Sequence, residues 1–200
     1  ERLGIEAVHT LRVHDPNDNS DKPGKGRDGD EGDDEVAIAA GPGGACERLV
    51  ELREAGTLDA VSLGMNSNKH DHQGVPEEIV RLIRTAAPGT FDSALLAGGW
   101  NLLTQAGLPC LQQCQESGVA VHVAGVFATG LLAGGDTYAY QLAPEEMLEK
   151  KRGWEQLCQD HSLSLPALAI AFATYPTCVE KLVLGIATEA QLEQNLAAME

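Results

Sequence analysis

Short apolar runs alternate with amphipathic segments along the chain, and this alternation predicts strands separated by helices. The apolar runs that we interpret as strands lie at 7–16, 59–65, 91–97, 119–125 and 181–186. The first, Ala7 to Pro16, is rich in β-branched residues and ends in His-Asp-Pro. It predicts a buried strand whose pairing stops at Pro16 and which delivers His14 to the rim of a sheet.

Helical signals lie between these runs. Gly44 to Ala55 is amphipathic, and Gly56 follows it where glycine commonly ends a helix. The next helix opens at Pro76 with Glu77 and Glu78 in its first turn, where acidic residues favour the helix dipole. Further helices are expected at 106–117, from 144, at 165–173, and after a capping box formed by Thr188 to Gln191.

Five strand and helix repeats predict an α/β fold with a parallel sheet, either open and doubly wound or part of a (β/α)₈ barrel. No G-x-G-x-x-G links a strand to a helix near the start, and candidate anion-binding chemistry falls after the last two strands. We therefore predict a partial (β/α)₈ barrel of about five C-terminal βα units, forming one domain over residues 1–200. Three further units would precede Glu1. Alone, five strands leave two unpaired edges and, we expect, an exposed apolar inner face.

One segment departs from globular composition. Residues 15–35 hold nine acidic residues, three basic residues and four glycines, with almost no apolar side chain. Such a segment cannot offset the entropy of ordering, so we predict a flexible acidic insertion. The ligand spacing of an EF-hand calcium loop is absent from it.

The net charge of the chain indicates which partners it repels. The chain has 30 acidic and 14 basic residues, a net charge of −16. This charge repels phosphate backbones and anionic lipids, so we expect no nucleic-acid partner and no binding to a membrane surface. No apolar run approaches the roughly 20 residues of a membrane span.

Cysteine usage indicates a reducing environment. The five cysteines are Cys46, Cys110, Cys114, Cys158 and Cys178. They include no C-x-x-C pair, and one cysteine would stay unpaired if the other four formed disulfide bonds. This favours reduced, buried thiols. No signal peptide is visible after Glu1, so we expect a cytoplasmic or other reducing location. We expect Cys110 and Cys114 to pack in the core and predict no metal site. His70, Asp71 and His72 are interpreted as exposed loop residues.

His14 is the first chemical candidate, although a single histidine can also be a satisfied core residue. Five motifs in order give it a context: His14-Asp15-Pro16, Ser62 to Asn66, Ala94 to Leu103, Gly125 to Leu132, and Gly185 to Asn195. Together they resemble the aldo-keto reductase superfamily, in particular its D-threo-aldose (L-fucose and L-galactose type) dehydrogenase branch. The resemblance covers nearly the whole chain except the acidic insertion.

The resemblance implies a role for each motif. His14 falls at the catalytic histidine that orients the substrate oxygen, and Asn66 falls where the family holds the nicotinamide carboxamide. Phe127 matches the aromatic residue that stacks on the nicotinamide ring. The pyrophosphate loop corresponds to Thr129, Gly130 and Leu132, and the adenosine end to Gly185, Thr188, Gln191, Gln194 and Asn195. Without the resemblance, each residue has a purely structural interpretation: Phe127 as a core aromatic residue, Asn66 as a turn residue and Thr188 as a helix cap.

Two departures from the family pattern concern ligands. The family binds the 2′-phosphate of NADP with basic side chains at the start of its last helix, but Gly185 to Gln191 contains none. We therefore expect NAD, with NADP less favoured. The family's glutamine on its sixth strand is replaced in Ala97-Gly98-Gly99, and we expect Trp100 to take part of that space beside the substrate.

A third departure concerns catalysis. The family's proton-transferring tyrosine, and the aspartate and lysine that tune it, cannot be assigned in this sequence. Tyr138 and Tyr140 are interpreted as loop or substrate-mouth residues. Three hypotheses stay open. The chain is part of an NAD-dependent enzyme that oxidises an aldose at C1 to a lactone or reduces carbonyls, or it is a non-catalytic subunit whose protein partner covers the open sheet edges, or it is an NAD-binding pseudoenzyme.

Overall fold

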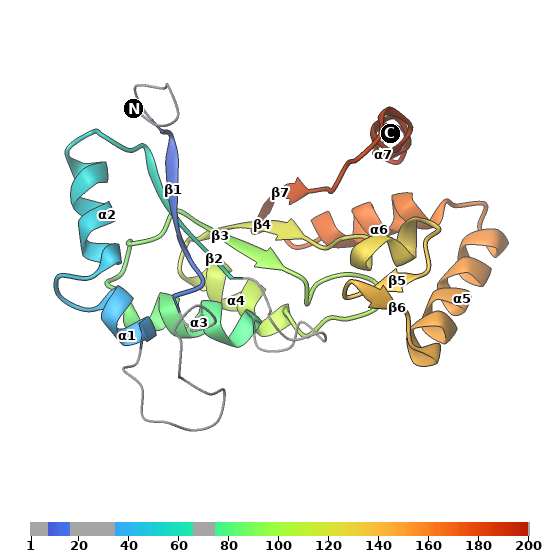
Figure 1. The fold of residues 1–200 in the computed structure, drawn as a ribbon, viewed down its shortest axis with the longest axis horizontal. Helices are drawn as coiled ribbons and strands as arrows, with labels where there is room; N and C mark the ends of the chain where they lie inside the picture. Colours follow the sequence, from blue (N-terminus) through green and yellow to red (C-terminus); the bar gives the residue numbers. More distant parts are fainter. Residues whose placement is uncertain (1–7, 17–34, 66–74, 200) are drawn as a thin grey trace.

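A five-stranded parallel sheet forms the centre of the computed structural model, which describes residues 8–16, 35–65 and 75–199 (Figure 1). The strands are β1 (Thr10–His14), β2 (Ala60–Met65), β3 (Ser93–Ala97), β4 (Ala120–Ala124) and β7 (Val179–Val183). They lie side by side in the order β1-β2-β3-β4-β7, and every neighbouring pair is parallel. The predicted five-stranded parallel sheet is therefore confirmed.

The order of the strands distinguishes the two architectures. A doubly wound sheet reverses direction at a switch point, so its spatial order differs from its chain order. Here the spatial order and the chain order are the same, because each crossover moves one strand further in one direction. Such a succession of βα units is that of a (β/α)₈ barrel, of which these strands are a part.

Helices cover one face of the sheet, which we call the outer face. The helices that contact strands are α2 (Ala45–Glu54), α3 (Val75–Thr85), α4 (Leu108–Glu116) and α6 (Leu165–Thr174). Under them lie Leu63 and Met65 of β2, Leu96 of β3 and Val123 of β4, each at most 1% exposed. Burial of these side chains against the helices forms the hydrophobic core.

Helix ends follow the predicted signals. Gly56 adopts a φ value of +71° directly after the helical segment that it was expected to end, and Gly118 follows the expected helix at 106–117 in the same way with a φ of +67°. Helix α3 buries Ile79 and Leu82 fully, and helix α2 buries Cys46.

The opposite side of the sheet, which we call the inner face, does not have the apolar character that we expected. Side chains alternate along a strand, so the residues between the core positions belong to this face. They include the polar residues Arg12, Ser62, Ser93, His122 and Lys181, together with the apolar residues Leu95, Ala97, Ala120, Ala124 and Val183. The inner face is therefore mixed instead of apolar, because polar residues occupy about half of its positions on the described strands.

The prediction of a buried first strand was also wrong. Only Val13 of β1 is buried, whereas Leu11 is 40% exposed and His14 is exposed as well. The reason is topological, because β1 is an edge strand of the described sheet and has a neighbour only in β2.

Several elements were not anticipated. They are helix α1 (Glu35–Ala40), the 3₁₀ helix η1 (Ala128–Ala133) and the hairpin of β5 (Thr137–Tyr138) and β6 (Gln141–Leu142). Helix α5 spans Glu145–Asp160, and β7 begins and ends earlier than its apolar run indicated. The predicted acidic insertion lies mostly outside the described residues, and Glu35 at its end begins α1.

The C-terminal helix α7 (Glu189–Ala197) lies apart from the other helices, beyond the end of β7 (Figure 1). It has no buried residue, and its apolar Leu192 and Leu196 are 42% and 55% exposed. All five cysteines are free, and four of them are buried. Among the described residues, no helix is long and apolar enough to cross a membrane.

Candidate functional site

The carboxyl end of β1 brings an imidazole and a carboxylate together. His14 Nδ1 lies 2.9 Å from Asp15 Oδ2, and the His14 side chain is 42% exposed. Asp15 takes a positive φ of 45°, and its backbone N–H donates to the carbonyl of Gly64, which holds the turn against β2. A carboxylate at this distance can fix the imidazole tautomer with the proton on Nδ1, leaving Nε2 for another partner.

The ends of β3 and β4 approach each other closely. The N–H of Gly98 donates to the carbonyl of Ala124, and a Cβ on Gly125 would lie 3.2 Å from the nitrogen of Gly98. Gly98, Gly99 and Gly125 all have φ values between 75° and 84°. Glycine is required here because the two backbones touch and turn in the left-handed region.

Asn101 links these two strand ends through hydrogen bonds, a role that no motif in the sequence predicted. Its side chain is buried, donates from Nδ2 to the carbonyl of Gly125 at 3.2 Å, and accepts from the N–H groups of Leu103 and Thr104. The signal in the sequence was an amide residue between Trp100 and Leu102 directly after a strand. Buried amides of this kind are satisfied by backbone groups, so they fix loops.

Trp100 is more enclosed than a residue at an open substrate mouth would be. Its indole is 6% exposed and stacks on Phe172 of α6, with ring centroids 4.9 Å apart. Its buried Nε1 has no hydrogen-bond partner among the residues that the structure describes. A role beside the substrate stays a prediction.

The segment after β4 forms a tightly bonded loop. Ala128 and Thr129 have positive φ values of 47° and 58°, which are uncommon for residues with a Cβ. Thr129 is held by two bonds, since its Oγ1 accepts from the N–H of Ala139 and its carbonyl accepts from the hydroxyl of Thr137. This loop is thus braced against the hairpin of β5 and β6.

The predicted pyrophosphate contacts are only partly available in this conformation. The N–H groups of Gly130 and Leu132 both donate to the carbonyl of Phe127, and the Leu132 side chain is fully buried. Phe127 itself is half-buried. The hydroxyl hydrogen of Thr129 can still be donated to a ligand, because Oγ1 acts as an acceptor toward Ala139.

The predicted cap by Thr188 at the start of α7 is confirmed, whereas the side chain of Gln191 reaches one residue beyond the position that a capping box gives it. Thr188 Oγ1 accepts from the N–H of Gln191, and Gln191 Oε1 accepts from the N–H of Ala187. Gly185 and Gln194 are exposed, while Asn195 is half-buried. Asn66 lies outside the described residues, as do His70, Asp71 and His72.

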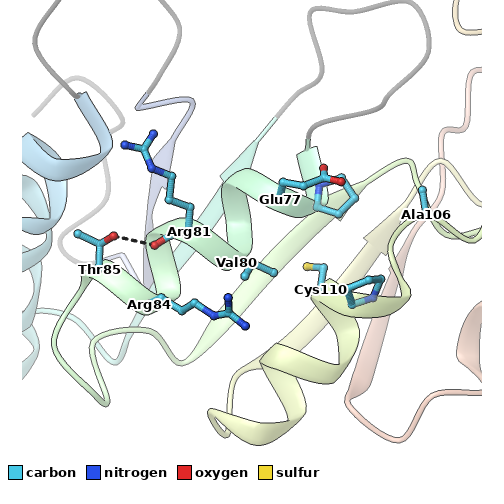
Figure 2. A pocket seen from close by; sticks show the side chains of 9 residues that line it. Glu77, Val80, Arg81, Arg84, Thr85, Ala106 and Cys110 are labelled. Carbon is cyan, nitrogen blue, oxygen red and sulfur yellow. Dashed lines mark hydrogen bonds between the residues drawn. The ribbon is translucent and has the colours of Figure 1, made fainter.

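A separate cavity of about 470 Å³ lies between α3 and α4 (Figure 2). Glu77, Val80, Arg84 and Cys110 line it, and it contains none of the predicted site residues. Burial and a hydrogen bond with Cys114 raise the pKa of Cys110, with the hydrogen bond as the larger cause. A protonated, fully buried thiol is a packing residue and no nucleophile.

Comparisons with known proteins agree with the fold. Residues 1–200 match the sequence profile of the Aldo/keto reductase family. A D-threo-aldose 1-dehydrogenase from Pseudomonas sp is 29% identical over 201 aligned residues, which cover 98% of this chain and 53% of that protein. A pyridoxal 4-dehydrogenase from Microbacterium luteolum is 30% identical over 79% of this chain and 44% of its own length.

The fold is also similar to solved structures of aldo-keto reductases. An aldo-keto reductase from Bacillus halodurans in its holo form superposes with a TM-score of 0.61 at 18% identity. The superposition covers all of this chain and 57% of that structure. The chain thus spans about half the length of the curated relatives that it matches.

Proposed function

Because this chain belongs to the aldo/keto reductase family, we propose that it is part of an NAD-dependent oxidoreductase that oxidises an aldose at C1 to a lactone. The observation that carries the proposal is the His14 and Asp15 pair at the carboxyl end of β1. Barrel enzymes place their catalytic groups at this end of the strands. The similarity to a D-threo-aldose 1-dehydrogenase supports the substrate class.

In the proposed reaction, His14 orients the sugar. With the Nδ1 proton donated to Asp15, Nε2 of the neutral imidazole accepts a hydrogen bond from the hydroxyl on C1. Oxidation removes a hydride from C1 and the proton from this hydroxyl, giving the lactone carbonyl. The bound nicotinamide would take up the hydride, and the proton would pass to a base on strands outside this chain.

The choice of NAD over NADP rests on charge. A 2′-phosphate requires a cationic partner, and the segment Gly185 to Gln191 contains no basic residue but does contain Glu189. The residues fit a nicotinamide cofactor in part. Phe127, Thr129 and the start of α7 would hold it, and the two engaged N–H groups in the loop after β4 would have to turn toward its phosphates.

The test is a screen of neutral aldoses with NAD and with NADP, using the protein at its native length. The proposal expects NADH formation with one or more aldoses and weaker use of NADP. NADH binding without turnover would contradict the enzymatic proposal and indicate a nucleotide-binding pseudoenzyme. Absence of both binding and turnover would indicate a non-catalytic subunit.

His14 gives the sharpest variant. We expect His14→Ala to lower turnover by roughly 10² to 10⁴-fold. A loss of this size is typical when a side chain that orients and hydrogen-bonds the reacting group is removed. The affinity for NADH should be nearly unchanged. Asp15→Asn is the matched variant, since it keeps His14 but weakens the hydrogen bond that orients it, and it should retain more turnover than His14→Ala.

A further inference from the structure

The side chain of Asn101 uses both ends of its amide. It is only 3% exposed, and its Oδ1 accepts from the N–H groups of Leu103 and Thr104 at 2.9 and 3.2 Å. An oxygen that accepts two backbone donors fixes the orientation of the amide, so Nδ2 points the other way. There it donates to the carbonyl of Gly125 at 3.2 Å, across from β3 to the end of β4.

The acceptor of this bond begins the turn that holds Phe127. The carbonyl of Gly125 also accepts from the N–H of Ala128 at 3.0 Å, which closes a turn over residues 125–128. Phe127 is the third residue of this turn, and its φ and ψ values of −92° and 13° are typical of the third residue of a type I turn. The Val126 side chain before it is 1% exposed, so packing holds the turn from one side.

Phe127 in turn anchors the loop after β4. Its carbonyl accepts from the N–H groups of Gly130 and Leu132 at 3.0 and 3.1 Å. Thr129 between them has a positive φ of 58°, a backbone conformation that persists only where surrounding contacts hold it. The bonds of Thr129 to the hairpin hold this loop at its far end, and the bond from Asn101 to the turn holds it at β4.

We propose that Asn101 is a positioning residue for the nicotinamide ring. Through the carbonyl of Gly125 it holds the turn that presents Phe127 to the ring. This role rests on the proposed function, in which Phe127 stacks on the nicotinamide. Asn101 acts through Phe127, so its loss should weaken cofactor binding more than it weakens binding of the sugar at His14.

The test separates the two ends of the amide. Asn101→Asp keeps the shape of the side chain and an oxygen that can accept from Leu103 and Thr104. Its second oxygen faces the carbonyl of Gly125, and two acceptors cannot bond to each other. Gln105→Ala is the matched control in the same loop, because it removes only the 2.8 Å bond from Gln105 Nε2 to the carbonyl of Asn101.

Fluorescence titration with NADH measures the main effect in the protein at its native length. Asn101→Asp should weaken NADH binding roughly tenfold or more, and Gln105→Ala by less than about twofold. The KM for the aldose that gives turnover should change by less than about twofold in both variants, since His14 is untouched. With Phe127→Ala already present, Asn101→Asp should have little further effect on NADH affinity.

A second measurement needs no cofactor. Amide hydrogen exchange at Gly130 and Leu132, whose N–H groups bond to Phe127, should be faster in Asn101→Asp than in Gln105→Ala. If Asn101→Asp does not fold, Asn101→Ser replaces it in both measurements. A serine hydroxyl can accept from the same N–H groups but is too short to donate to Gly125, and it carries no charge.

Two results would overturn this role for Asn101 while the proposed function stands. One is NADH affinity that is unchanged in Asn101→Asp or Asn101→Ser although the unaltered protein binds NADH. The other is an equal rise in the dissociation constant of NADH and in the KM for the aldose, which would show that Asn101 only stabilises the fold. Absence of NADH binding in the unaltered protein would contradict the proposed function and this role together.

Discussion

The outer and inner faces of the sheet share the same strands but differ in composition. On the central strands β2, β3 and β4, the outer face consists of apolar side chains at most 1% exposed, such as Leu63, Leu96 and Val123. The inner face holds Arg12 and His122, which are half-buried, and Lys181, which is exposed. Apolar burial of the first kind supplies folding free energy, whereas polar and charged groups of the second kind cost free energy to desolvate. The difference indicates that burial on the outer face supplies most of the folding free energy.

The largest expected effect comes from the outer face. Leu96→Ala removes a fully buried side chain of β3 and should lower the free energy of unfolding by about 2–5 kcal/mol. Its neighbour Leu95 points to the inner face and is only half-buried, so Leu95→Ala is the matched control and should cost clearly less. Chemical denaturation of both variants measures the difference, and equal losses would contradict the assignment of the faces.

The next effect tests the position of Arg12. Gly64→Ala places a Cβ 2.6 Å from Arg12 Cδ, so it should displace the guanidinium from Ser62 at a cost of about 1–3 kcal/mol. In a background with Arg12→Ala the same substitution should cost much less, because the clash is then gone. A double-mutant cycle measures this coupling, and additive losses would show that Arg12 does not lie over Gly64.

The smallest effect is a pH dependence from the inner face. Partial burial in the folded state lowers the pKa of His122 below the unfolded value, so the unfolded state binds more protons as the pH falls. Stability is therefore present above the unfolded pKa and declines as the pH drops from about 7 toward the folded pKa. His122→Asn removes the titrating group, so it should flatten this decline in urea titrations. An identical decline in both proteins would assign it to other groups.

The sequence predicted the parts of the fold that depend on local chemistry. The five strands, the glycines that end α2 and α4, and the cap of α7 by Thr188 all have short-range signals, and all are present. The exposure of His14 had no such signal, because it depends on β1 having a neighbour on one side only. The same holds for the pairing of β3 and β4 ends through Asn101 and Gly125, which lie far apart in the chain.

The candidate site was predictable only in part. A histidine and an aspartate after a strand indicate a rim site, and the structure brings them to 2.9 Å. The hydrogen bonds that hold the loop after β4 could not be predicted from its glycines. They join Thr129 to Thr137 and Ala139 of the following hairpin. The cofactor roles of Phe127, Thr129, Gly130 and Leu132 stay predictions, as do those of Gly185, Thr188, Gln191, Gln194 and Asn195.

The most direct test of the proposed function compares the protein at its native length with its His14→Ala variant, measuring aldose-dependent NADH formation and NADH affinity on the same preparations. We expect turnover to fall by roughly two or more orders of magnitude while the dissociation constant of NADH stays nearly the same. Equal loss of turnover and of NADH affinity would contradict the assignment of His14 to the substrate. Unchanged turnover would remove His14 from the reaction altogether.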